Sequence, residues 1–210
     1  MGFGNWWDRT VVPRIVKFGC ATEDIMALRR DVVPLAKGQV FELGCGGGIN
    51  QQLYDPSAIS GFSGLDPSAK LLDYARAEAA KKGWQADIRA GFGEDIPFAD
   101  DSFDTVVCTF TLCSVNDPAR TLSELRRVLK PGGTFLYAEH GRSPDQHIAR
   151  KQERIDPLWS RVFGNCHLAR PVTPAIERAG FAASPVGQRY LKEKPSIAGW
   201  MEWGVAMKPG

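Results

Sequence analysis

The stretch "VFELGCGGGIN", residues 40–50, begins with an apolar run that contains one acid, Glu42. Glycine then occupies four of the five positions from 44 to 48. The apolar residues at 40–43 are typical of a short buried strand. Glycine adopts positive φ without a steric cost, so a strand followed by several glycines can turn sharply and let a ligand approach the backbone. The stretch therefore predicts a ligand-binding turn at the end of a strand.

The residues around this turn exclude two phosphate-binding motifs. A P-loop requires lysine and then serine or threonine after its last glycine, whereas Gly48 is followed by Ile49 and Asn50. A dinucleotide fingerprint requires a third glycine at the position that Ile49 occupies. Glu42 would repel a pyrophosphate, but it can face a cationic ligand. A ligand with positive charge is therefore expected.

A second acid narrows the choice of ligand. Asp66, in "GLDPS", ends the next apolar run, twenty-four residues after Glu42. An acid at the end of a second strand can accept hydrogen bonds from two ribose hydroxyls. Together the two acids indicate a nucleoside with a cationic tail and no phosphate. S-adenosylmethionine fits this description.

The rest of the chain alternates strand and helix patterns, which predicts a mainly parallel sheet with helices on both sides. After a helix with Thr173 as its cap, Pro174 at its start and Gly180 at its end, two β-like runs follow with no helix pattern between them. These runs, 182–191 and 200–207, should pair as an antiparallel hairpin on the sheet edge. The other expected strands are 40–43, 61–65, 85–90, 104–110 and 134–138, and the other expected helices are 68–82 and 118–129.

Composition limits the class of protein. The 210 residues are 43% apolar and 24% charged, which suits one globular domain, and a net charge of +2 does not indicate a nucleic-acid partner. The five cysteines form no CxxC pair and no zinc spacing, so no metal site is expected and a reducing, cytoplasmic location is predicted. The sequence has no apolar segment approaching the ~20 residues that span a bilayer and no signal peptide.

The N-terminal stretch "NWWDRTVVPRIVKFGC" alternates bulky apolar residues with basic ones. This pattern would suit a helix on an anionic membrane surface, or a lid over a pocket. Pro13 interrupts the pattern, so peripheral membrane contact is not the favoured interpretation. Trp6 and Trp7 are either ordinary packing or part of the roof of the pocket.

Four motifs resemble those of class I S-adenosylmethionine-dependent methyltransferases: "VFELGCGGG", "GLDPS", "GEDIPFADDSFDTVV" and "LRRVLKPGGTFLYAEHG". This resemblance covers residues 38–141. "TLCSV", "EHG" and "RIDPLWSRVFGNCHLAR" are similar to the methyltransferase-like thiol methyltransferases and to bacterial phosphatidylethanolamine N-methyltransferase-like proteins, as far as residue 170.

The resemblance implies an α/β, Rossmann-like methyltransferase fold: a mainly parallel seven-stranded sheet with a C-terminal antiparallel hairpin and a helical N-terminal cap. One domain, residues 1–210, is expected. Within it we expect an N-terminal cap at 1–37, a cofactor-binding core at 38–141, an acceptor-side insertion at 142–170, and a C-terminal helix and hairpin at 171–210.

The resemblance also implies roles for individual residues. Glu42 would hold the ammonium group of the cofactor, the glycines would let the backbone approach it, and Asp66 would bind the ribose. Phe92 stands where many relatives have an adenine-contacting acid, so Phe92 or its neighbours should contact adenine, and Leu112 should lie near the methionine portion. The predicted cofactor-binding residues are Glu42, Gly44, Cys45, Gly46, Gly48, Asp66, Pro67, Gly93, Glu94, Thr109 and Phe110.

Structural interpretations of the same residues remain open. The glycines could serve only a tight turn, and Asp66 could cap the helix that begins near Ser68; the two roles of Asp66 are compatible. Cys45, Cys108 and Cys113 are typical of small core residues.

The acceptor must lose a proton before methylation if it is a thiol or an ammonium group, so a histidine at the end of the fifth strand would help. His140, in "AEHG", is the first candidate catalytic residue and His167, in "NCHLAR", the second; each could instead be structural. Trp159 and Phe163 lie four residues apart, on one helix face, so they could line an acceptor pocket or pack in the core.

The expected activity is methyl transfer to a small, fairly apolar acceptor, with a thiol ahead of a phospholipid amine or another small metabolite methylated at N, C or O. A non-catalytic nucleoside-binding module is the alternative from another class. A nicotinamide-dependent oxidoreductase is opposed by the missing third glycine. The expected partner is a small-molecule acceptor and not a nucleic acid, and the oligomeric state is left open.

Overall fold

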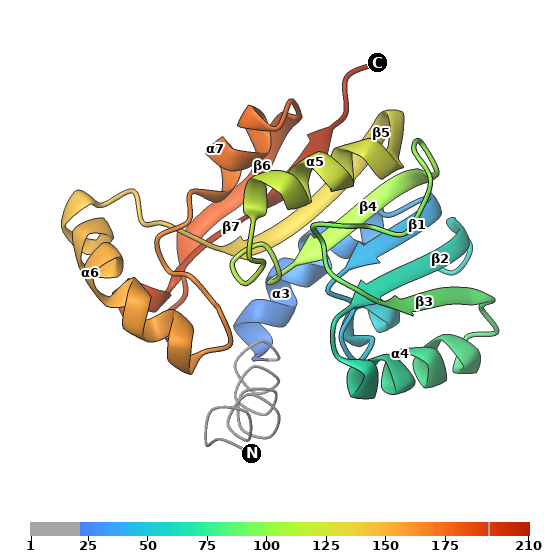
Figure 1. The fold of residues 1–210 in the computed structure, drawn as a ribbon, viewed down its shortest axis with the longest axis horizontal. Coiled ribbons are helices and arrows are strands. Elements are labelled where there is room, and N and C mark those ends of the chain that lie inside the picture. The colour runs from blue at the N-terminus through green and yellow to red at the C-terminus, as the bar shows by residue number, and fades with distance from the viewer. Residues whose placement is uncertain (1–21, 193) are drawn as a thin grey trace.

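The computed structural model of the protein describes residues 22–192 and 194–210. A seven-stranded sheet, in the order β3-β2-β1-β4-β5-β7-β6, forms its centre (Figure 1). The first five strands pair in parallel, and β7 runs antiparallel to both β5 and β6. The strands are β1 (Gly38–Leu43), β2 (Ile59–Asp66), β3 (Ala86–Ala90), β4 (Phe103–Thr109), β5 (Leu129–His140), β6 (Ala182–Tyr190) and β7 (Trp200–Met207).

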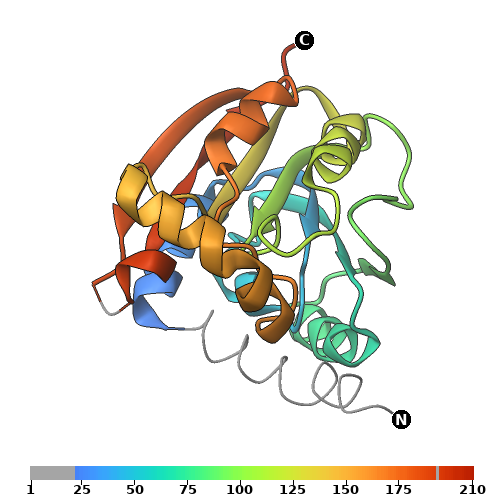
Figure 2. The same cartoon turned by 60° about the vertical axis from the view of Figure 1, so that its left-hand side comes forward.

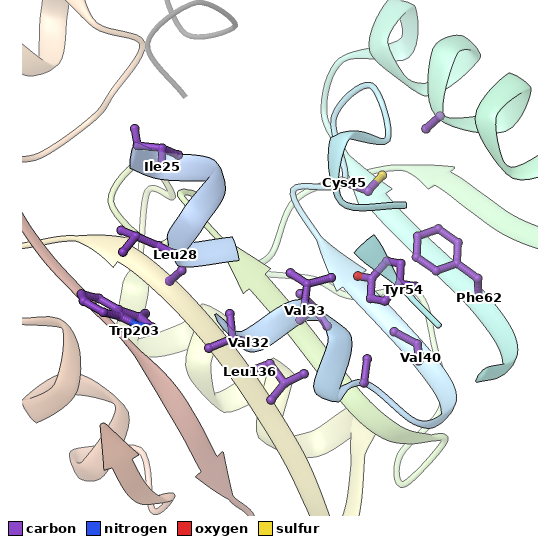
Figure 3. Close-up of a cluster of buried hydrophobic side chains, with 14 of the residues drawn as sticks. Ile25, Leu28, Val32, Val33, Val40, Cys45, Tyr54, Phe62, Leu136 and Trp203 are labelled. Atoms are coloured by element: carbon purple, nitrogen blue, oxygen red, sulfur yellow. The ribbon is translucent and has the colours of Figure 1, made fainter. Parts of the chain in front are cut away.

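Helices cover both faces of the sheet, each through one apolar side. On one face α3 and α4 bury residues such as Leu28, Val32 and Leu72, and Figure 3 shows Leu28 and Val32 close to Leu136 and Trp203. On the other face α5 and α7 bury Leu125 and Ile176 against a second cluster. The helices are α3 (Glu23–Val32), α4 (Ala69–Lys81), α5 (Pro118–Val128), α6 (Gln146–Val162) and α7 (Val172–Arg178), with short 3₁₀ turns at Val33–Leu35, Ile49–Leu53 and Ser196–Ala198.

Two helices begin with an aspartate as their N-cap residue. Proline occupies the first turn of α5, where no intrahelical donor is needed, and the Asp117 side chain accepts a hydrogen bond from Arg120 N at 3.0 Å. Asp145 caps α6 in the same way, with its Oδ1 accepting from His147 N at 2.7 Å.

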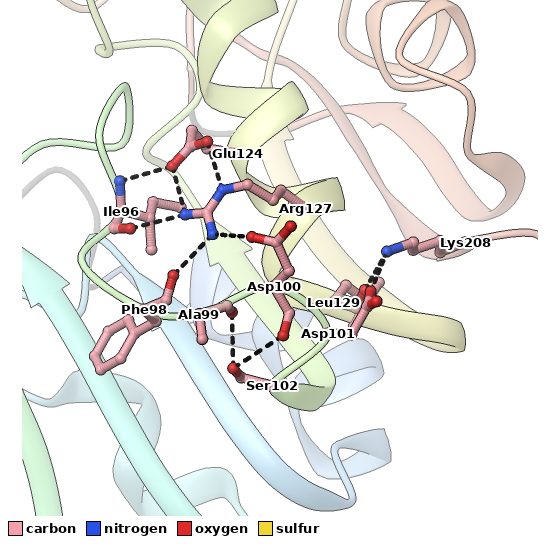
Figure 4. Close-up of polar contacts among 10 residues, drawn as sticks. All are labelled: Ile96, Phe98, Ala99, Asp100, Asp101, Ser102, Glu124, Arg127, Leu129 and Lys208. Carbon is pink, nitrogen blue, oxygen red and sulfur yellow. Dashed lines mark hydrogen bonds and ion pairs between the residues drawn. The ribbon is translucent and has the colours of Figure 1, made fainter.

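A polar cluster fixes the loop that leads into β4, at the edge of the sheet opposite to the carboxyl ends of the parallel strands. Arg127 donates to both Glu124 oxygens at 2.8 Å, to Asp100, and to the carbonyls of Ile96 and Phe98 (Figure 4). These contacts belong to the "GEDIPFADDSFDTVV" motif, which therefore joins the cofactor-binding core to α5.

α6 stands apart from the helices that cover the two faces (Figures 1 and 2). It packs on the 3₁₀ turn before β7, and Gln152 donates from α6 to Ile197 O at 3.0 Å. Arg142 N donates to Arg170 O at 2.8 Å, so a backbone bond joins the two ends of the 142–170 segment.

The expected mainly parallel sheet and C-terminal hairpin are confirmed. One helix start was wrong: α7 begins at Val172 with Pro171 as its N-cap residue, rather than at Pro174 with a Thr173 cap. The reason is that the Thr173 hydroxyl donates to Glu202 on β7. Trp6, Trp7 and the basic N-terminal stretch lie outside the described residues. None of the helices in the described part of the chain combines the length and apolar composition that a bilayer crossing needs.

Candidate active site

Glu42 ends β1 as a buried carboxylate, 1% exposed, and receives two side-chain hydrogen bonds. Asn50 Nδ2 donates to its Oε1 at 2.9 Å and the Tyr54 hydroxyl to its Oε2 at 2.7 Å. Burial raises the pKa of Glu42 to about 7, although these bonds and the charge of Arg29 act in the opposite direction. The carboxylate is therefore placed where a cation would stabilise its charged form.

Arg29 reaches this carboxylate from α3. Its Nη1 donates to Asn50 Oδ1 at 2.7 Å and to the Thr109 hydroxyl, and its guanidinium lies 4.8 Å from the centre of the Phe110 ring. Asn50 Nδ2 also donates to Thr109 Oγ1 at 3.0 Å. The predicted residues Glu42, Thr109 and Phe110 therefore meet, around an arginine and an asparagine that were not predicted.

The glycine turn is bonded directly to Asp66. Gly46 N donates to Asp66 Oδ2 at 3.0 Å, and Ser68 N donates to Asp66 Oδ1 at 2.8 Å. Burial raises the pKa of Asp66, opposed by these two backbone bonds. Ser68 is the N-cap residue of α4 but makes no side-chain cap bond. Asp66 thus organises the start of α4, and each of its oxygens keeps a second lone pair for a ligand.

The three predicted glycines of the turn after β1 have positive φ, but they differ in the space beside them. A Cβ on Gly44, at φ 70°, would lie 2.0 Å from Thr111 Oγ1, so this glycine permits close packing. A Cβ on Gly46, at φ 49°, would meet nothing nearer than 3.9 Å. Gly48, at φ 81°, would press against the Gln51 amide at 3.0 Å. Gly46 therefore borders open space, as a glycine that a cofactor covers would.

The remaining predicted cofactor-binding residues differ in burial and packing. Cys45 is 1% exposed in the core, which agrees with the structural interpretation, whereas Pro67 is exposed beside Asp66. Gly93 packs on Thr121 and Leu43, and a Cβ there would approach both within 3.0 Å.

Glu94 forms hydrogen bonds with the backbone at the start of α5. Its Oε1 accepts hydrogen bonds from Asn116 N at 2.7 Å and from Asp117 N at 3.0 Å. Phe92, in contrast, has 59% of its surface exposed. An exposed ring two residues after β3 is the better candidate for stacking on a flat apolar group.

His140 ends β5 with one nitrogen partnered and one free. It is 6% exposed, and its Nδ1 lies 3.7 Å from Cys166 Sγ. Its Nε2 is buried and has no hydrogen-bond partner among the described residues. A buried nitrogen without a partner is costly, so this atom is suited to meeting a ligand.

His167 is held in a closed pair. Its Nδ1 lies 2.6 Å from Asp156 Oδ2, and Asp156 Oδ1 also accepts from Leu168 N. His167 N donates to Cys113 O at 2.8 Å, which anchors the 163–170 stretch to the loop after β4. These contacts favour the structural interpretation of His167.

Two aromatic rings stack on each other at the end of α6. Trp159 and Phe163 have centroids 4.0 Å apart and an interplanar angle of 25°, and both side chains are half-buried. Arg170 Nη1 donates to the carbonyls of Leu112 and Val115 at 2.7 Å. The predicted acceptor segment therefore contacts the loop that follows β4.

Glu139 supports that loop and was missed by sequence reasoning. It is fully buried, and its Oε1 accepts from Thr111 N at 2.9 Å and from Leu112 N at 3.1 Å. Burial raises its pKa to about 7, opposed by these bonds. An acid inside the apolar strand "TFLYAEH" was the signal that could have found it.

Comparisons with known proteins place the chain in a family. Residues 41–137 match the family described as "Methyltransferase domain". The chain is 36% identical to thiol S-methyltransferase TMT1B of Rattus norvegicus over 170 residues, 76% of this chain and 68% of the relative. It is also 36% identical to the TMT1B protein of Homo sapiens, covering 78% of this chain and 71% of the relative. The solved structure of YcgJ from Bacillus subtilis shares the fold at 17% identity and a TM-score of 0.63, over 83% of this chain and 93% of that one.

The protein is an S-adenosylmethionine-dependent methyltransferase, and S-adenosylmethionine is the cofactor. The chain belongs to the methyltransferase family that includes the TMT1B thiol S-methyltransferases.

Proposed function

We propose that this chain transfers the methyl group of S-adenosylmethionine to the sulfur of a small, apolar thiol. The observation that carries the proposal is the buried, unpartnered Nε2 of His140, at the end of the strand next to β4, together with the stacked Trp159 and Phe163 in the segment whose Cys166 contacts His140 Nδ1. The names of the relatives, which are thiol S-methyltransferases, support the same acceptor.

We also propose how the chain holds the cofactor. Glu42 faces the ammonium group and Arg29 the carboxylate of its methionine portion, because the two opposite charges are linked through Asn50 near the end of β1. The free lone pairs of Asp66 accept hydrogen bonds from the ribose hydroxyls, and Gly46 leaves room for the backbone approach. Phe92 stacks on the adenine ring.

The cofactor supplies an electrophilic methyl group on a sulfonium, so the chain has to align the acceptor and remove its proton. His140 Nε2 accepts the proton of the acceptor thiol, while its Nδ1–H donates to Cys166 Sγ. Trp159 and Phe163 exclude water from the reacting sulfur, and residues 142–170 act as the acceptor-side insertion.

The test is an acceptor panel with the purified protein and S-adenosylmethionine. Small alkyl and aromatic thiols, phosphatidylethanolamine vesicles and small amines are compared, and methylated products are identified by mass spectrometry. We expect methyl thioethers from the apolar thiols. Methylation of the phospholipid or the amines with no thioether would overturn the thiol assignment.

A further inference from the structure

Two cysteines meet beside His140, although they are far apart in the sequence. Cys113 lies in the loop after β4 and Cys166 in the stretch after α6, and the two side chains are close enough for each to shift the pKa of the other. The bond from His167 N to Cys113 O, at 2.8 Å, sets the main chains next to each other. Asn165 Nδ2, which donates to Ser114 O at 2.7 Å, adds a second bond between the same two stretches.

The two thiols differ in accessibility and in charge. Cys113 is 5% exposed, whereas Cys166 is only partly buried and can meet a small solute. The interaction with Cys113, followed by the hydrogen bond to His140, lowers the pKa of Cys166 against the effect of burial. The same pairing raises the pKa of Cys113, and burial raises it further. Cys166, the more exposed of the two and 3.7 Å from His140 Nδ1, is therefore the nucleophile of the pair, and the buried Cys113 is the resolving thiol.

We infer that Cys113 and Cys166 form a peroxide-reactive pair that closes to a disulfide across the acceptor side of the site. The Cys166 thiolate attacks one oxygen of hydrogen peroxide, an S–O bond forms, the O–O bond breaks, and the departing hydroxide takes a proton and leaves as water. The Cys113 sulfur then attacks the sulfenic sulfur, an S–S bond forms, and the hydroxide that leaves takes the Cys113 proton. Two thiols are oxidised, and one peroxide is reduced to two waters.

Formation of the disulfide removes the negative charge of the Cys166 sulfur, which faces His140 Nδ1. It also links the stretch after α6 covalently to the loop after β4. Methyl transfer should therefore stop on oxidation and return when a dithiol reduces the bond. This consequence for activity rests on the proposed function, whereas formation of the disulfide does not.

The first test uses no cofactor and no acceptor. The protein is treated with hydrogen peroxide, and the cysteine thiols that remain free are blocked. A non-reducing digest is then mapped by mass spectrometry. We expect one cross-linked peptide pair containing Cys113 and Cys166, with the buried Cys45 and Cys108 blocked only after unfolding. A disulfide that pairs either cysteine with another residue, or no disulfide at all, would overturn the inference.

Two variants separate the steps. Cys113→Ser should stop at the sulfenic acid, which dimedone traps on Cys166, and the matched variant Cys45→Ser should still give the disulfide. His140→Asn should slow the reaction of Cys166 with peroxide about ten-fold or more, because the thiolate fraction falls when the imidazole is removed. Equal rates in His140→Asn and the unsubstituted protein would contradict the role of this cluster, even if a Cys113 variant failed to fold.

The activity test distinguishes failure of this inference from failure of the proposed function. If the disulfide forms but no thiol is methylated before oxidation, the proposed function fails and the modification site stands. If the reduced protein methylates thiols and peroxide gives no Cys113–Cys166 bond, the inference fails alone.

Discussion

Gly46 N and Asp66 Oδ2 are joined by a 3.0 Å hydrogen bond, so the glycine turn after β1 and the acid that ends β2 form one unit. The same carboxylate accepts from Ser68 N through its other oxygen. The acid therefore holds the turn and α4 in place while keeping lone pairs for a ligand. The structural and the ligand-binding interpretations of Asp66 are both compatible with this geometry.

Asp66→Ala should weaken S-adenosylmethionine binding by about 1–3 kcal/mol, because hydroxyl groups of the ligand and backbone donors of the protein lose their acceptor. Titration calorimetry measures the change. Asp87→Ala is the matched control, since Asp87 is an acid on β3 whose contacts are with Arg89. Cofactor affinity equal in Asp66→Ala and Asp87→Ala would refute the ribose assignment.

Gly44→Ala and Gly46→Ala should separate packing from cofactor binding. Both substitutions force alanine into positive φ, at about 1–2 kcal/mol each. The new Cβ at position 44 would also overlap the Thr111 side chain, so Gly44→Ala should lower the free energy of unfolding more. Gly46→Ala has room in the fold and should lose cofactor affinity out of proportion to stability. Denaturant unfolding and calorimetry give the two readouts, and the opposite ranking would contradict the open-space argument.

The pH dependence of cofactor binding should report Glu42. Its pKa of about 7 in the free protein means that the carboxyl is partly protonated near neutrality, while the ammonium of the ligand favours the carboxylate. Binding should therefore release a proton at about pH 6.5, and the affinity for the cofactor should rise with pH until Glu42 is ionised. Calorimetry in buffers of different ionisation enthalpy measures the release. Glu42→Gln should abolish it, whereas Glu139→Gln should keep it; release that persists in Glu42→Gln would assign the proton elsewhere.

Arg29→Met should shift that pH dependence upward, because the positive charge of Arg29 lowers the pKa of Glu42. It should also weaken cofactor binding at high pH, where Glu42 is ionised in both proteins. Arg30→Met is the matched control on the same helix, since Arg30 pairs with Glu23 at the surface. An unchanged midpoint of the pH curve in Arg29→Met would contradict the coupling of the two charges.

His140→Ala should reduce turnover according to the acidity of the acceptor. For a weakly acidic alkyl thiol the loss of a general base should cost about 10²–10⁴-fold in turnover. An aromatic thiol that is already ionised at the assay pH should lose much less, and cofactor affinity should change little in either case. Steady-state rates across a series of thiols measure this trend. Equal losses for all acceptors would mean that His140 is structural.

The sequence alone predicted the sheet and the acids at or near the ends of its first two strands. This was possible because apolar runs, glycines and prolines determine local backbone structure. The sequence alone did not predict that Arg29, Asn50 and Tyr54 lie around Glu42. Asn50 and Tyr54 bond to Glu42 from the 3₁₀ turn at Ile49–Leu53 and the residue after it, whereas Arg29 bonds to Asn50 from α3, whose position depends on its packing against the sheet. Nor could local patterns show that Thr173 bonds to Glu202, twenty-nine residues away, which moved the start of α7.

The acceptor side shows the same limit. Trp159 and Phe163 were expected on one helix face, and their stacking follows from that spacing. The closed pair of His167 with Asp156 and the approach of Cys166 to His140 depend on the turn after α6. A single sequence contains no local signal for such contacts.

The backbone bond from Arg142 N to Arg170 O has a consequence for how new specificities arise in this scaffold. Because the segment between them leaves the sheet and returns to nearly the same point, its length and sequence can change without altering the register of β5 or β7. Insertions, deletions and grafts between these two anchor points are thus the least disruptive route to a different acceptor. If the segment has the acceptor-side role proposed above, a library that exchanges only residues 142–170 will vary the choice of acceptor and leave the cofactor-binding strands unchanged.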